Sequence, residues 1–455
     1  MSLTLEQRLD TLPAGAEVAW CGQQYVTAGQ LRADVATLAG WLAAHPARHW
    51  ALCLDDAYAF TVALLACGMA GCVAVLPGHR RPAGLEEQAP YIEALLVDGD
   101  WSSAVLSFPV CHWQAVMAAP LSAAPTTPWP APLSVLMFTS GSTGVPQAIL
   151  KQERELLAEV EIQAGLWADA LAGAVILATV SQQHIYGLLF RILLPLRLGL
   201  PLAAATCTTP EQLQAAVRGL MRPWALISSP AFLEHLDPDL SCPGARWLVS
   251  SGGPLSASGA ALSQRCLGLS PVELYGSSET GGIAWRQQHG SDWMLLPGLT
   301  LSVDAAETWW LTSPFLPAGQ RWALSDRLVW QENGFRLLGR ADRVIKLAEK
   351  RISLDEVERR LRAVPWIAEA AVVPLEIGGR RCLGAVLIPS AEGWRLHATL
   401  GEGRLLLQLR QALRPWLEPV ALPRRLRCLS AMPVNSQGKR PYAVLKELFD
   451  VAIEC

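Results

Sequence analysis

The sequence predicts an α/β fold: a large N-terminal domain of helix-covered, mostly parallel sheets with a small β-barrel, followed by a smaller α+β C-terminal domain. Three observations carry this prediction. Helical stretches alternate with short apolar strands through residues 16–275, as in parallel sheets covered by helices. After residue 297 the short alternating runs are typical of a small antiparallel barrel or meander. Near residue 340 the charge density rises sharply, ahead of a compact α+β segment.

The N-terminal elements follow from hydrophobic periodicity and capping. Thr27 is the expected N-cap of a helix at Ala28–Ala44, and the apolar run Trp50–Leu54 is the strand after it. An Ala/Pro/Thr-rich linker is expected at 121–132. Further helix–strand pairs are expected at 56–77, 84–98, 152–180, 186–206 and 210–228, and further strands at Arg246–Ser250 and Val272–Tyr275.

The rise in charge near residue 340 places a domain boundary. Two domains are expected, residues 1–341 and residues 342–455, and the second is of ordinary size for a domain. Its expected elements are helices at Leu354–Ala363 and Gly403–Leu417 and strands at Ala368–Pro374, Arg381–Ile388 and Arg424–Leu429.

Composition favours a well-buried globular enzyme and argues against nucleic-acid binding. Of the 455 residues 51% are apolar and 17% are charged, and the net charge of −3 provides no field to attract nucleic acid or an anionic membrane. The eleven cysteines form no CxxC pair, which predicts reduced thiols in a cytoplasmic protein. The eight histidines form no metal-binding pattern, so no structural metal is expected.

One apolar stretch has almost the length of a membrane span. Residues 60–78 contain no charge, but glycines and Pro77 interrupt them. A helix that leads into a parallel strand explains the stretch better than a span of about twenty residues. No apolar signal core is seen at the N-terminus, and a soluble protein is expected.

The chemistry begins at a glycine-rich loop. The apolar strand Leu133–Phe138 leads into Thr139, Ser140, Gly141, Ser142, Thr143 and Gly144, followed by Pro146. Glycines let backbone N–H groups converge on one point, and hydroxyls add donors, so such a loop can hold a polyphosphate. An ordinary surface turn is the alternative, and the missing Gly-Lys-Ser/Thr ending disfavours a P-loop NTPase.

Four later stretches could complete a nucleotide site. Ser250–Leu255 has two adjacent glycines, against which a flat ring could lie, and Glu273–Gly282 combines an aromatic ring, small hydroxyls and an acid suited to Mg²⁺. Asp326 could accept hydrogen bonds from ribose hydroxyls, and Lys439 ends a loop near the C-terminus. Each stretch alone is also compatible with an ordinary turn or a solvated side chain.

The order of these motifs resembles the adenylate-forming superfamily, which includes acyl- and aryl-CoA synthetases, peptide-synthetase adenylation domains and luciferases. The resemblance runs from about Leu133 to Tyr442. It implies an ATP- and Mg²⁺-dependent acid–thiol ligase with a mobile C-terminal domain. The acid and ATP would give acyl-AMP and pyrophosphate, and CoA or the phosphopantetheine of an acyl carrier protein would then accept the acyl group.

The resemblance also implies a role for each motif residue. His184 would lie near the acyl carboxylate, although a core histidine is the alternative, and Asp342 would be the hinge between two catalytic arrangements. Lys439 would contact the carboxylate oxygen and the α-phosphate. The remaining implied roles are β,γ-phosphate binding by Thr139, Ser140, Gly141, Ser142, Thr143 and Gly144; adenine contact by Gly252, Gly253, Pro254, Glu273 and Tyr275, with Gly276 in the same set; α-phosphate contact by Ser278; Mg²⁺ ligation by Glu279; and ribose binding by Asp326 with Arg340.

Three positions depart from the family pattern. Gln147 stands where a lysine is usual, so one pyrophosphate-facing charge is missing, and Lys151 is a candidate replacement. Ser325 replaces a glycine, and Glu349 replaces a glycine beside which a thiol arm passes.

The last departure leaves the acceptor open between CoA and an acidic carrier protein. A basic surface could meet such a carrier, or could simply be a solvated face: Arg340, Arg343, Lys346, Lys350, Arg351, Arg424, Arg425 and Arg427.

The expected substrate is an aromatic or fatty acyl acid. An amino acid is disfavoured, because no clear aspartate for an α-amino group is found at the start of the pocket region. The predicted pocket comprises His184, Ser228, Ser229, Ser250, Ser251 and Ser277. A non-catalytic nucleotide-binding or scaffold subunit is the alternative, suggested by Gln147 and Glu349.

Overall fold

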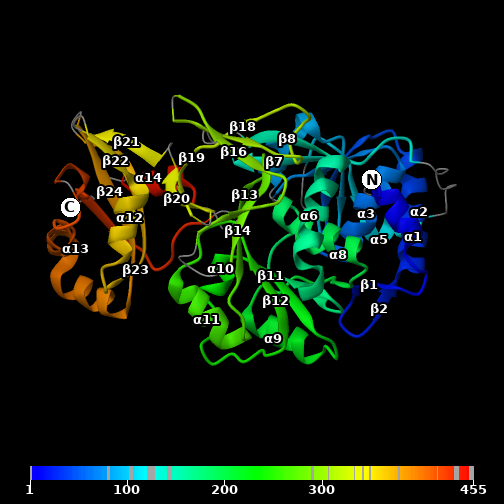
Figure 1. The fold of residues 1–455 in the computed structure, drawn as a ribbon, viewed down its shortest axis with the longest axis horizontal. Helices are drawn as coiled ribbons and strands as arrows, with labels where there is room; N and C mark the ends of the chain where they lie inside the picture. The colour runs from blue at the N-terminus through cyan, green and yellow to red at the C-terminus, as the bar shows by residue number, and fades with distance from the viewer. Residues whose placement is uncertain are drawn as a thin grey trace. The chain divides into compact units, whose positions relative to one another are not determined.

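The structure is a computed structural model, and the chain forms two compact units (Figure 1). The first comprises Met1–Leu301 with Leu311–Trp322, and the second comprises Ser302–Trp310 with Ala323–Cys455. The domain boundary predicted between residues 341 and 342 is not tested by this division into compact units, and it stays a prediction. The residues described are 3–78, 82–101, 106–119, 129–140, 146–287, 292–305, 307–332, 334–340, 343–347, 350–377, 380–417, 419–434 and 440–449.

Two mostly parallel sheets build the first unit. The smaller has the order β6 (Val110–His112), β5 (Ala94–Val97), β3 (His49–Cys53), β4 (Val73–Leu76), β7 (Ser134–Ser140), β8 (Pro146–Gln152). The larger has the order β15 (Met294–Leu295), β14 (Gly281–Arg286), β13 (Val272–Ser277), β12 (Ala245–Ser250), β11 (Trp224–Ser228), β9 (Val175–Ala178), β10 (Leu202–Ala203), β1 (Glu17–Trp20), β2 (Tyr25–Thr27). The parallel strands are apolar and buried because helices cover them.

The helices of the first unit start where the sequence provides caps. Thr27 accepts a hydrogen bond from the Gln30 amide at the start of α2, which spans Ala28–Ala44 as predicted. Asp56 caps α3 in the same way. The helices are α1 (Leu5–Thr11), α2, α3 (Ala57–Met69), α4 (Pro82–Glu87), η1 (Ala89–Tyr91), α5 (Trp113–Met117), α6 (Glu153–Leu171), α7 (Ile185–Gly187), the π-helical turn η2 (Leu188–Leu193), α8 (Leu194–Leu198), α9 (Pro210–Arg218), α10 (Pro230–Leu233) and α11 (Ala257–Leu267).

The uncharged stretch at 60–78 is a helix followed by a parallel strand, as expected. Helix α3 is buried almost all round, and β4 pairs with β3 and β7. Within the described residues, no helix combines the length and apolarity that crossing a membrane requires.

The second unit contains antiparallel hairpins and a small α+β body. The strands β16 (Thr300–Val303), β17 (Trp309–Thr312) and β18 (Trp322–Ala323) form a small sheet. The hairpins are β19 (Asp326–Gln331) with β20 (Gly334–Arg340), and β21 (Val344–Leu347) with β22 (Lys350–Ser353). The α+β body comprises β23 (Ile367–Ile377), β24 (Arg380–Pro389), β25 (Arg425–Cys428), α12 (Leu354–Arg362), α13 (Ala391–Leu413), η4 (Pro419–Ala421) and α14 (Tyr442–Glu447).

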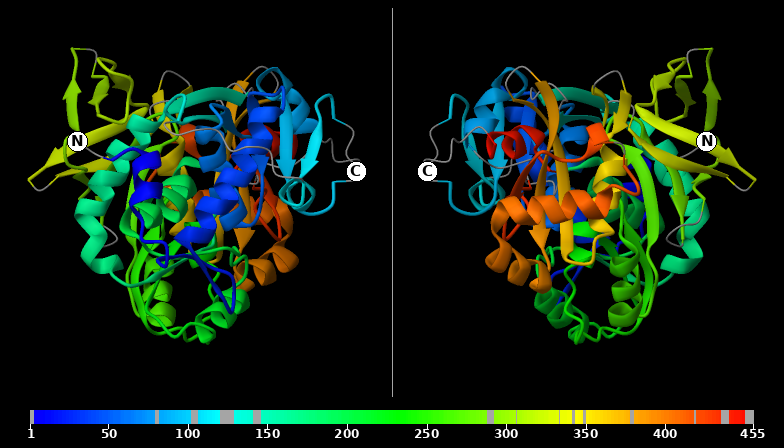
Figure 2. Two further views of the ribbon diagram at one scale, coloured as in Figure 1. Left: turned by 90° about the vertical axis from the view of Figure 1, so that its right-hand side faces the viewer. Right: turned by 90° about the vertical axis from the view of Figure 1, so that its left-hand side faces the viewer.

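Two predicted helices have different bounds in the structure. The predicted helix at Gly403–Leu417 is the second half of α13, which begins at Ala391 and breaks at Gly401. Gly401 adopts φ +69°, a left-handed conformation that favours glycine and interrupts the helical periodicity. The predicted helix at 186–198 is divided into α7, η2 and α8. Figure 2 shows α13 in orange beside the strands of its own unit.

A buried carboxylate joins the elements of the second unit. Glu358, on α12, is 4% exposed. Its side chain accepts hydrogen bonds from the Arg343 guanidinium at 2.6 Å and from the Val372 amide at 2.9 Å, and it lies 3.4 Å from the Tyr442 hydroxyl. One side chain thus connects α12 with β23, α14 and the segment before β21.

Replacing Glu358 is expected to destabilise the second unit selectively. Glu358→Gln removes one of the two carboxylates that pair with the half-buried Arg343 and leaves only Asp355, so the unfolding free energy of this unit is expected to fall by about 2 kcal/mol. Denaturant unfolding of the full chain measures this loss. The control is Glu356→Gln on the same helix, because Glu356 forms only partly exposed pairs with Arg359 and Arg360 and is expected to cost less than about 1 kcal/mol. Equal losses in the two variants would contradict the assigned role of Glu358.

Candidate active site

The candidate site begins at the turn between β13 and β14, which carries the acid Glu279. The hydroxyls of Ser277 and Thr280 lie 3.0 Å apart, and the Ser277 amide donates to the Thr280 hydroxyl at 3.2 Å. Thr280 is fully buried, whereas Glu279 is half-buried. The turn is therefore anchored on its inner side and leaves one carboxylate accessible.

Two glycines allow this turn to be tight. Gly281 adopts φ +70°, and a Cβ there would lie 2.2 Å from a carboxylate oxygen of Glu159. A Cβ on Gly276 would lie 2.3 Å from the carbonyl oxygen of Gly281. Any larger residue at either position would displace the turn. Gly276 thus has a structural reason for its place in the motif.

A buried lysine holds the backbone of the Glu279 turn through a hydrogen bond. Lys151, on β8, is 3% exposed. Its ammonium donates to the carbonyl oxygens of Glu279 at 2.8 Å and of Phe315 at 3.0 Å. Burial lowers the pKa of Lys151, and the nearby carboxylates of Glu159, Glu155 and Glu279 oppose that shift. The suggestion that Lys151 replaces the missing phosphate-facing lysine at position 147 is therefore wrong, since its ammonium is already engaged inside the protein.

A buried acid completes this support. Glu159, on α6, accepts hydrogen bonds from the Gly282 amide at 2.8 Å and from the Gln163 side-chain amide at 3.1 Å. Burial raises the pKa of Glu159 to about 7, although Gly282, Lys151 and Gln163 act in the opposite direction. The backbone at both ends of the Glu279 turn is thus held by buried side chains of opposite charge.

The glycine pair of the second motif lies next to this turn. Gly252, Gly253 and Pro254 are exposed after β12, whose last residue, Ser250, pairs with Glu273 on β13. The Ser251 hydroxyl donates to the Leu274 carbonyl at 3.1 Å, which holds the two strand ends together. The carboxyl ends of adjacent parallel strands are where α/β folds place ligands. The predicted adenine residues Gly252, Gly253, Pro254 and Tyr275 are therefore brought together.

Glu273 has a role that its motif does not reveal. It is 4% exposed, and its two carboxylate oxygens accept from Nε and Nη2 of Arg286, both at 2.8 Å. The Arg286 guanidinium lies over the Trp293 ring at 4.4 Å, and Tyr275 packs against the same ring. This bidentate pair ties β13 to β14. The carboxylate of Glu273 is already occupied, and adenine contact by this residue stays a prediction.

His184 lies at the start of α7, two residues before Tyr186, which contacts the ends of β11 and β12. It is half-buried and forms the N-cap of α7. The neighbouring Tyr186 donates from its hydroxyl to the carbonyls of Ser228 and Val249, both at 3.0 Å. Ser228 and Ser250 are opposite each other in the register of β11 and β12, and their membership of one substrate pocket stays a prediction. The sequence analysis missed Tyr186, although it stands two residues after His184.

The buried serine hydroxyls differ in their hydrogen bonding. The Ser228 hydroxyl lies 2.9 Å from the Thr179 hydroxyl. The Ser250 hydroxyl is buried and has no hydrogen-bond partner among the described residues. Of these two, Ser250 therefore has hydrogen-bonding capacity left for a ligand.

Arg191 is a second residue that the sequence analysis missed. It is fully buried on η2, and burial lowers its pKa to about 10. Its guanidinium donates to the side chains of Gln182 and Thr206, both at 2.7 Å. Gln182 in turn donates at 2.7 Å to the carbonyl of Leu54, the residue that follows β3. Arg191 therefore fixes the segment that leads to His184.

Several predicted residues lie outside the described residues. They are Gly141, Ser142, Thr143, Gly144, Asp342, Glu349 and Lys439, together with the side chains of Thr139, Ser140, Arg340, Lys346, Lys350 and Arg351. The strands that flank the phosphate loop are described, and β7 and β8 form an antiparallel pair up to Ser140 and Pro146. In the second unit, Asp326 and Arg340 are opposite each other in the register of β19 and β20, and their joint role in ribose binding stays a prediction.

The donor chemistry of the Glu279 turn fits Mg²⁺ held jointly with phosphates. Within the described parts of the chain, no group of three or more His, Cys, Asp or Glu side chains could hold a metal. Mg²⁺ in nucleotide sites is commonly bound by one or two carboxylates together with substrate phosphates and water. Glu279 provides such a carboxylate.

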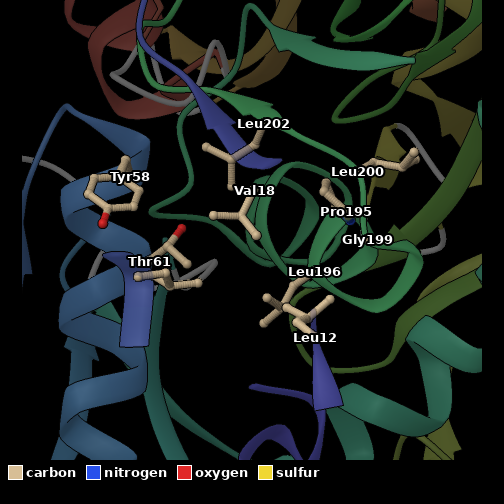
Figure 3. Close-up of a pocket in the computed structure, with 10 residues that line it drawn as sticks. Leu12, Val18, Tyr58, Thr61, Pro195, Leu196, Gly199, Leu200 and Leu202 are labelled. Carbon is tan, nitrogen blue, oxygen red and sulfur yellow. The ribbon is translucent and has the colours of Figure 1, made fainter. Parts of the chain in front are cut away.

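A separate apolar hollow lies away from these motifs (Figure 3). Its two hydroxyls are already bonded, since Tyr58 donates to Asp34 at 2.5 Å and Thr61 donates to the Ala57 carbonyl at 2.7 Å. It therefore offers only apolar contact and includes none of the predicted site residues. Its lining is Leu12, Val18, Leu31, Tyr58, Thr61, Pro195, Leu196, Gly199, Leu200 and Leu202.

Sequence comparison identifies the family. Residues 83–307 match the family described as AMP-binding enzyme. A 4-coumarate–CoA ligase from Rhodobacter capsulatus is 32% identical over 308 residues, which are 66% of this chain and 73% of the relative. The chain belongs to the AMP-binding enzyme family. A 4-coumarate–CoA ligase from Cereibacter sphaeroides is 28% identical over 312 residues, covering 66% of this chain and 68% of the relative.

Solved structures of this family confirm the predicted fold class over the whole chain. ATP-bound MatB from Rhodopseudomonas palustris has a TM-score of 0.83 at 18% identity, covering 99% of each chain. A benzoate CoA ligase from Burkholderia xenovorans has a TM-score of 0.79 at 18% identity, covering 98% of this chain and all of the other. The similarity to the 4-coumarate–CoA ligases confirms the expected enzyme class, an acid–thiol ligase that forms an acyl-adenylate.

The buried acid Glu159 is expected to make stability depend on pH. Between pH 4.5 and about 7 the folded state keeps a proton on Glu159 that the unfolded state has lost, so its contribution to stability falls as pH rises through this window. Glu159→Gln does not titrate. The variant is therefore expected to gain about 2 kcal/mol relative to the wild type between pH 5 and pH 8.

Urea unfolding of both proteins at pH 5 and at pH 8 measures this difference. Glu153→Gln is the control, because Glu153 is also buried on α6 but accepts from the Leu5 and Leu133 amides, away from the turn. A stability difference between Glu159→Gln and the wild type that stays constant with pH would show that Glu159 does not titrate in this range.

Proposed function

We propose that this AMP-binding enzyme activates an aromatic or fatty acyl carboxylic acid with ATP and then transfers the acyl group to a thiol. In the first step a carboxylate oxygen attacks the α-phosphorus, the bond to the β-phosphate oxygen breaks, and pyrophosphate leaves. In the second step the thiolate attacks the acyl carbon and AMP leaves. The observation that carries the proposal is the anchored Glu279 turn beside the exposed Gly252–Pro254 loop at the carboxyl ends of β12 and β13.

The proposed roles follow from the chemistry of each residue. Glu279 would hold Mg²⁺, which offsets the charge of the phosphates, and Ser278 would contact the α-phosphate. Lys439 would stabilise the charge that develops as pyrophosphate leaves, and Asp326 with Arg340 would hold the ribose. Asp342 would be the hinge about which the C-terminal domain turns between the two steps.

An aromatic acid has the most support as substrate. The relatives that cover two thirds of the chain are 4-coumarate–CoA ligases, which act on an aromatic acid according to their names. Tyr186, which the sequence analysis missed, bonds the Val249 carbonyl next to the predicted pocket residue Ser250, whose hydroxyl is buried. A ring could pack against the tyrosine while a polar substituent reaches a serine.

For the acceptor, we propose CoA or the phosphopantetheine of an acyl carrier protein. The names of the relatives favour CoA, whereas the basic residues of the second unit favour an acidic partner. Not all of the predicted basic surface is free: Arg343 pairs with Asp355 and Glu358, and Arg427 pairs with Glu402. Arg424 and Arg425 are exposed and would be the carrier-facing residues.

Exchange of radiolabelled pyrophosphate into ATP, screened over aromatic and fatty acids, tests the first step. Exchange with at least one acid is expected in the wild type. In Glu279→Gln and Lys439→Ala it is expected to fall by about a hundredfold or more, because the first change weakens the hold on Mg²⁺ and the second removes the ammonium that would stabilise the leaving pyrophosphate.

The control for this screen is Arg154→Gln, an exposed position on α6. It should leave exchange unchanged. ATP binding without exchange for any acid would support the alternative of a non-catalytic nucleotide-binding or scaffold subunit, which Gln147 suggests.

Mass spectrometry of the products identifies the acceptor. The activated acid is incubated separately with CoA and with a holo-carrier protein. Loading of the carrier that is lost in Arg424→Glu, with unchanged acyl-CoA formation, is the expected result for carrier transfer. Acylation of CoA alone would rule out the carrier.

A further inference from the structure

Two buried charged side chains, Lys151 and Glu159, contact the Glu279 turn, and ordinary core packing does not explain them. A lysine that is 3% exposed and a glutamate that is 3% exposed have both been removed from water. Such a pair is a poor source of stability, because desolvation of the two charges offsets most of their attraction. Apolar side chains of similar size would fill the same space at lower cost. The pair therefore calls for an explanation other than stability.

The hydrogen bonds of the pair point to the backbone of the turn. Lys151 donates to the carbonyl of Glu279, the accessible acid of the turn. Glu159 accepts from the amide of Gly282, three residues further along. The carboxylate lies so close to Gly281 that no side chain fits there. Both groups thus act on main-chain atoms that flank the Glu279 side chain.

The pair also connects separate parts of the first unit. Lys151 is near the end of β8, the strand that returns from the predicted phosphate loop, and Glu159 is two turns into α6. The second carbonyl held by Lys151 belongs to Phe315, which is fully buried. The neighbouring acid Glu155 is engaged by Arg154 and by the Gln152 amide. Glu159 is accordingly the acid that both lies near Lys151 and bonds the turn.

We infer that Lys151 and Glu159 are positioning residues, which fix the backbone of residues 277–282 so that the Glu279 carboxylate is held for a divalent cation shared with nucleotide phosphates. The inference rests on the proposed function for the identity of the cation and nucleotide. Neither residue touches the ligand. Each acts through a main-chain bond to the turn, as outer partners of metal ligands do.

The affinity for ATP, measured with and without Mg²⁺, distinguishes a loss of Glu279 positioning from general damage to the fold. Isothermal calorimetry compares ATP with Mg²⁺ and ATP with EDTA. Lys151→Met leaves the carbonyls of Glu279 and Phe315 without their donor, so its Kd for ATP with Mg²⁺ is expected to rise about tenfold or more, while its Kd in EDTA changes less than about twofold. Damage to the fold alone would weaken both.

Two further variants keep the test decisive. Glu159→Gln is isosteric and can still accept from Gly282, so a smaller rise, about threefold to fivefold, is expected in the presence of Mg²⁺. It carries the test if Lys151→Met does not fold. In the double variant the effects are expected to be less than additive, because both residues hold one turn. Glu153→Gln is the matched control and should leave both dissociation constants unchanged.

Hydrogen exchange of the ligand-free protein provides a readout that is independent of activity. The amides of residues 277–282 are expected to exchange faster in Lys151→Met than in the wild type or in Glu153→Gln. Folded variants with unchanged exchange and an unchanged ratio of the two dissociation constants would overturn the inference. A wild type that does not bind ATP with Mg²⁺ would overturn it as well.

The outcomes separate this inference from the proposed function. If the wild type binds ATP with Mg²⁺ and the variants behave as expected, but no acid supports pyrophosphate exchange, the ligase proposal fails and the positioning role holds. If exchange is normal and the variants bind ATP with Mg²⁺ as the wild type does, the positioning role fails and the ligase proposal holds.

Discussion

The candidate site depends on two opposite charges placed inside the first unit. Lys151 and Glu159 bind carbonyl and amide groups of one short turn, and that turn carries the acid Glu279. Such a turn would otherwise expose its backbone groups to water and sample several conformations, because glycines at 276, 281 and 282 impose little restraint. The buried side chains supply the restraint that the local sequence lacks. The cost is the desolvation of the two side chains. It is reflected in their pKa values, because burial lowers the pKa of Lys151 and raises the pKa of Glu159.

The same arrangement recurs around the predicted acid-binding region. Arg191 is fully buried and holds the segment before His184 through Gln182 and Thr206. Arg286 holds Glu273 on the neighbouring strand. In each case a buried arginine donates hydrogen bonds to buried polar side chains that would otherwise lack a partner. Removing one member of such a pair would leave a buried polar or charged group without a partner, at a cost in stability. The site is thus built on rigid elements, with accessible residues placed at the ends of strands.

In the second unit the constraint is of the same kind but serves the fold. Glu358 joins α12, β23 and α14 through one carboxylate, and Arg343 pairs with both Glu358 and Asp355. Arg343 is therefore a structural residue, although it stands in a charge-rich segment that could be interpreted as a binding surface. The exposed Arg424 and Arg425 differ in that respect. Charge density in a sequence does not distinguish the two situations, because pairing depends on what folds against each residue.

The sequence by itself determined the elements and the family. Hydrophobic alternation predicted the α/β fold, and Thr27 as a cap predicted α2 to the residue. The order of the glycine-rich motifs predicted the grouping of Gly252–Pro254 with Tyr275 and Glu279. These features are local in the chain, so local patterns reveal them. The bounds of α13 and the division of the helix at 186–198 were missed, because a single left-handed glycine and a π-helical turn leave little trace in periodicity. Only the tertiary structure decided what Lys151, Glu159, Tyr186 and Arg191 do. Their partners lie up to 164 residues away in sequence, and burial, which changes the role of a charge from solvated to structural, arises only when those distant segments pack.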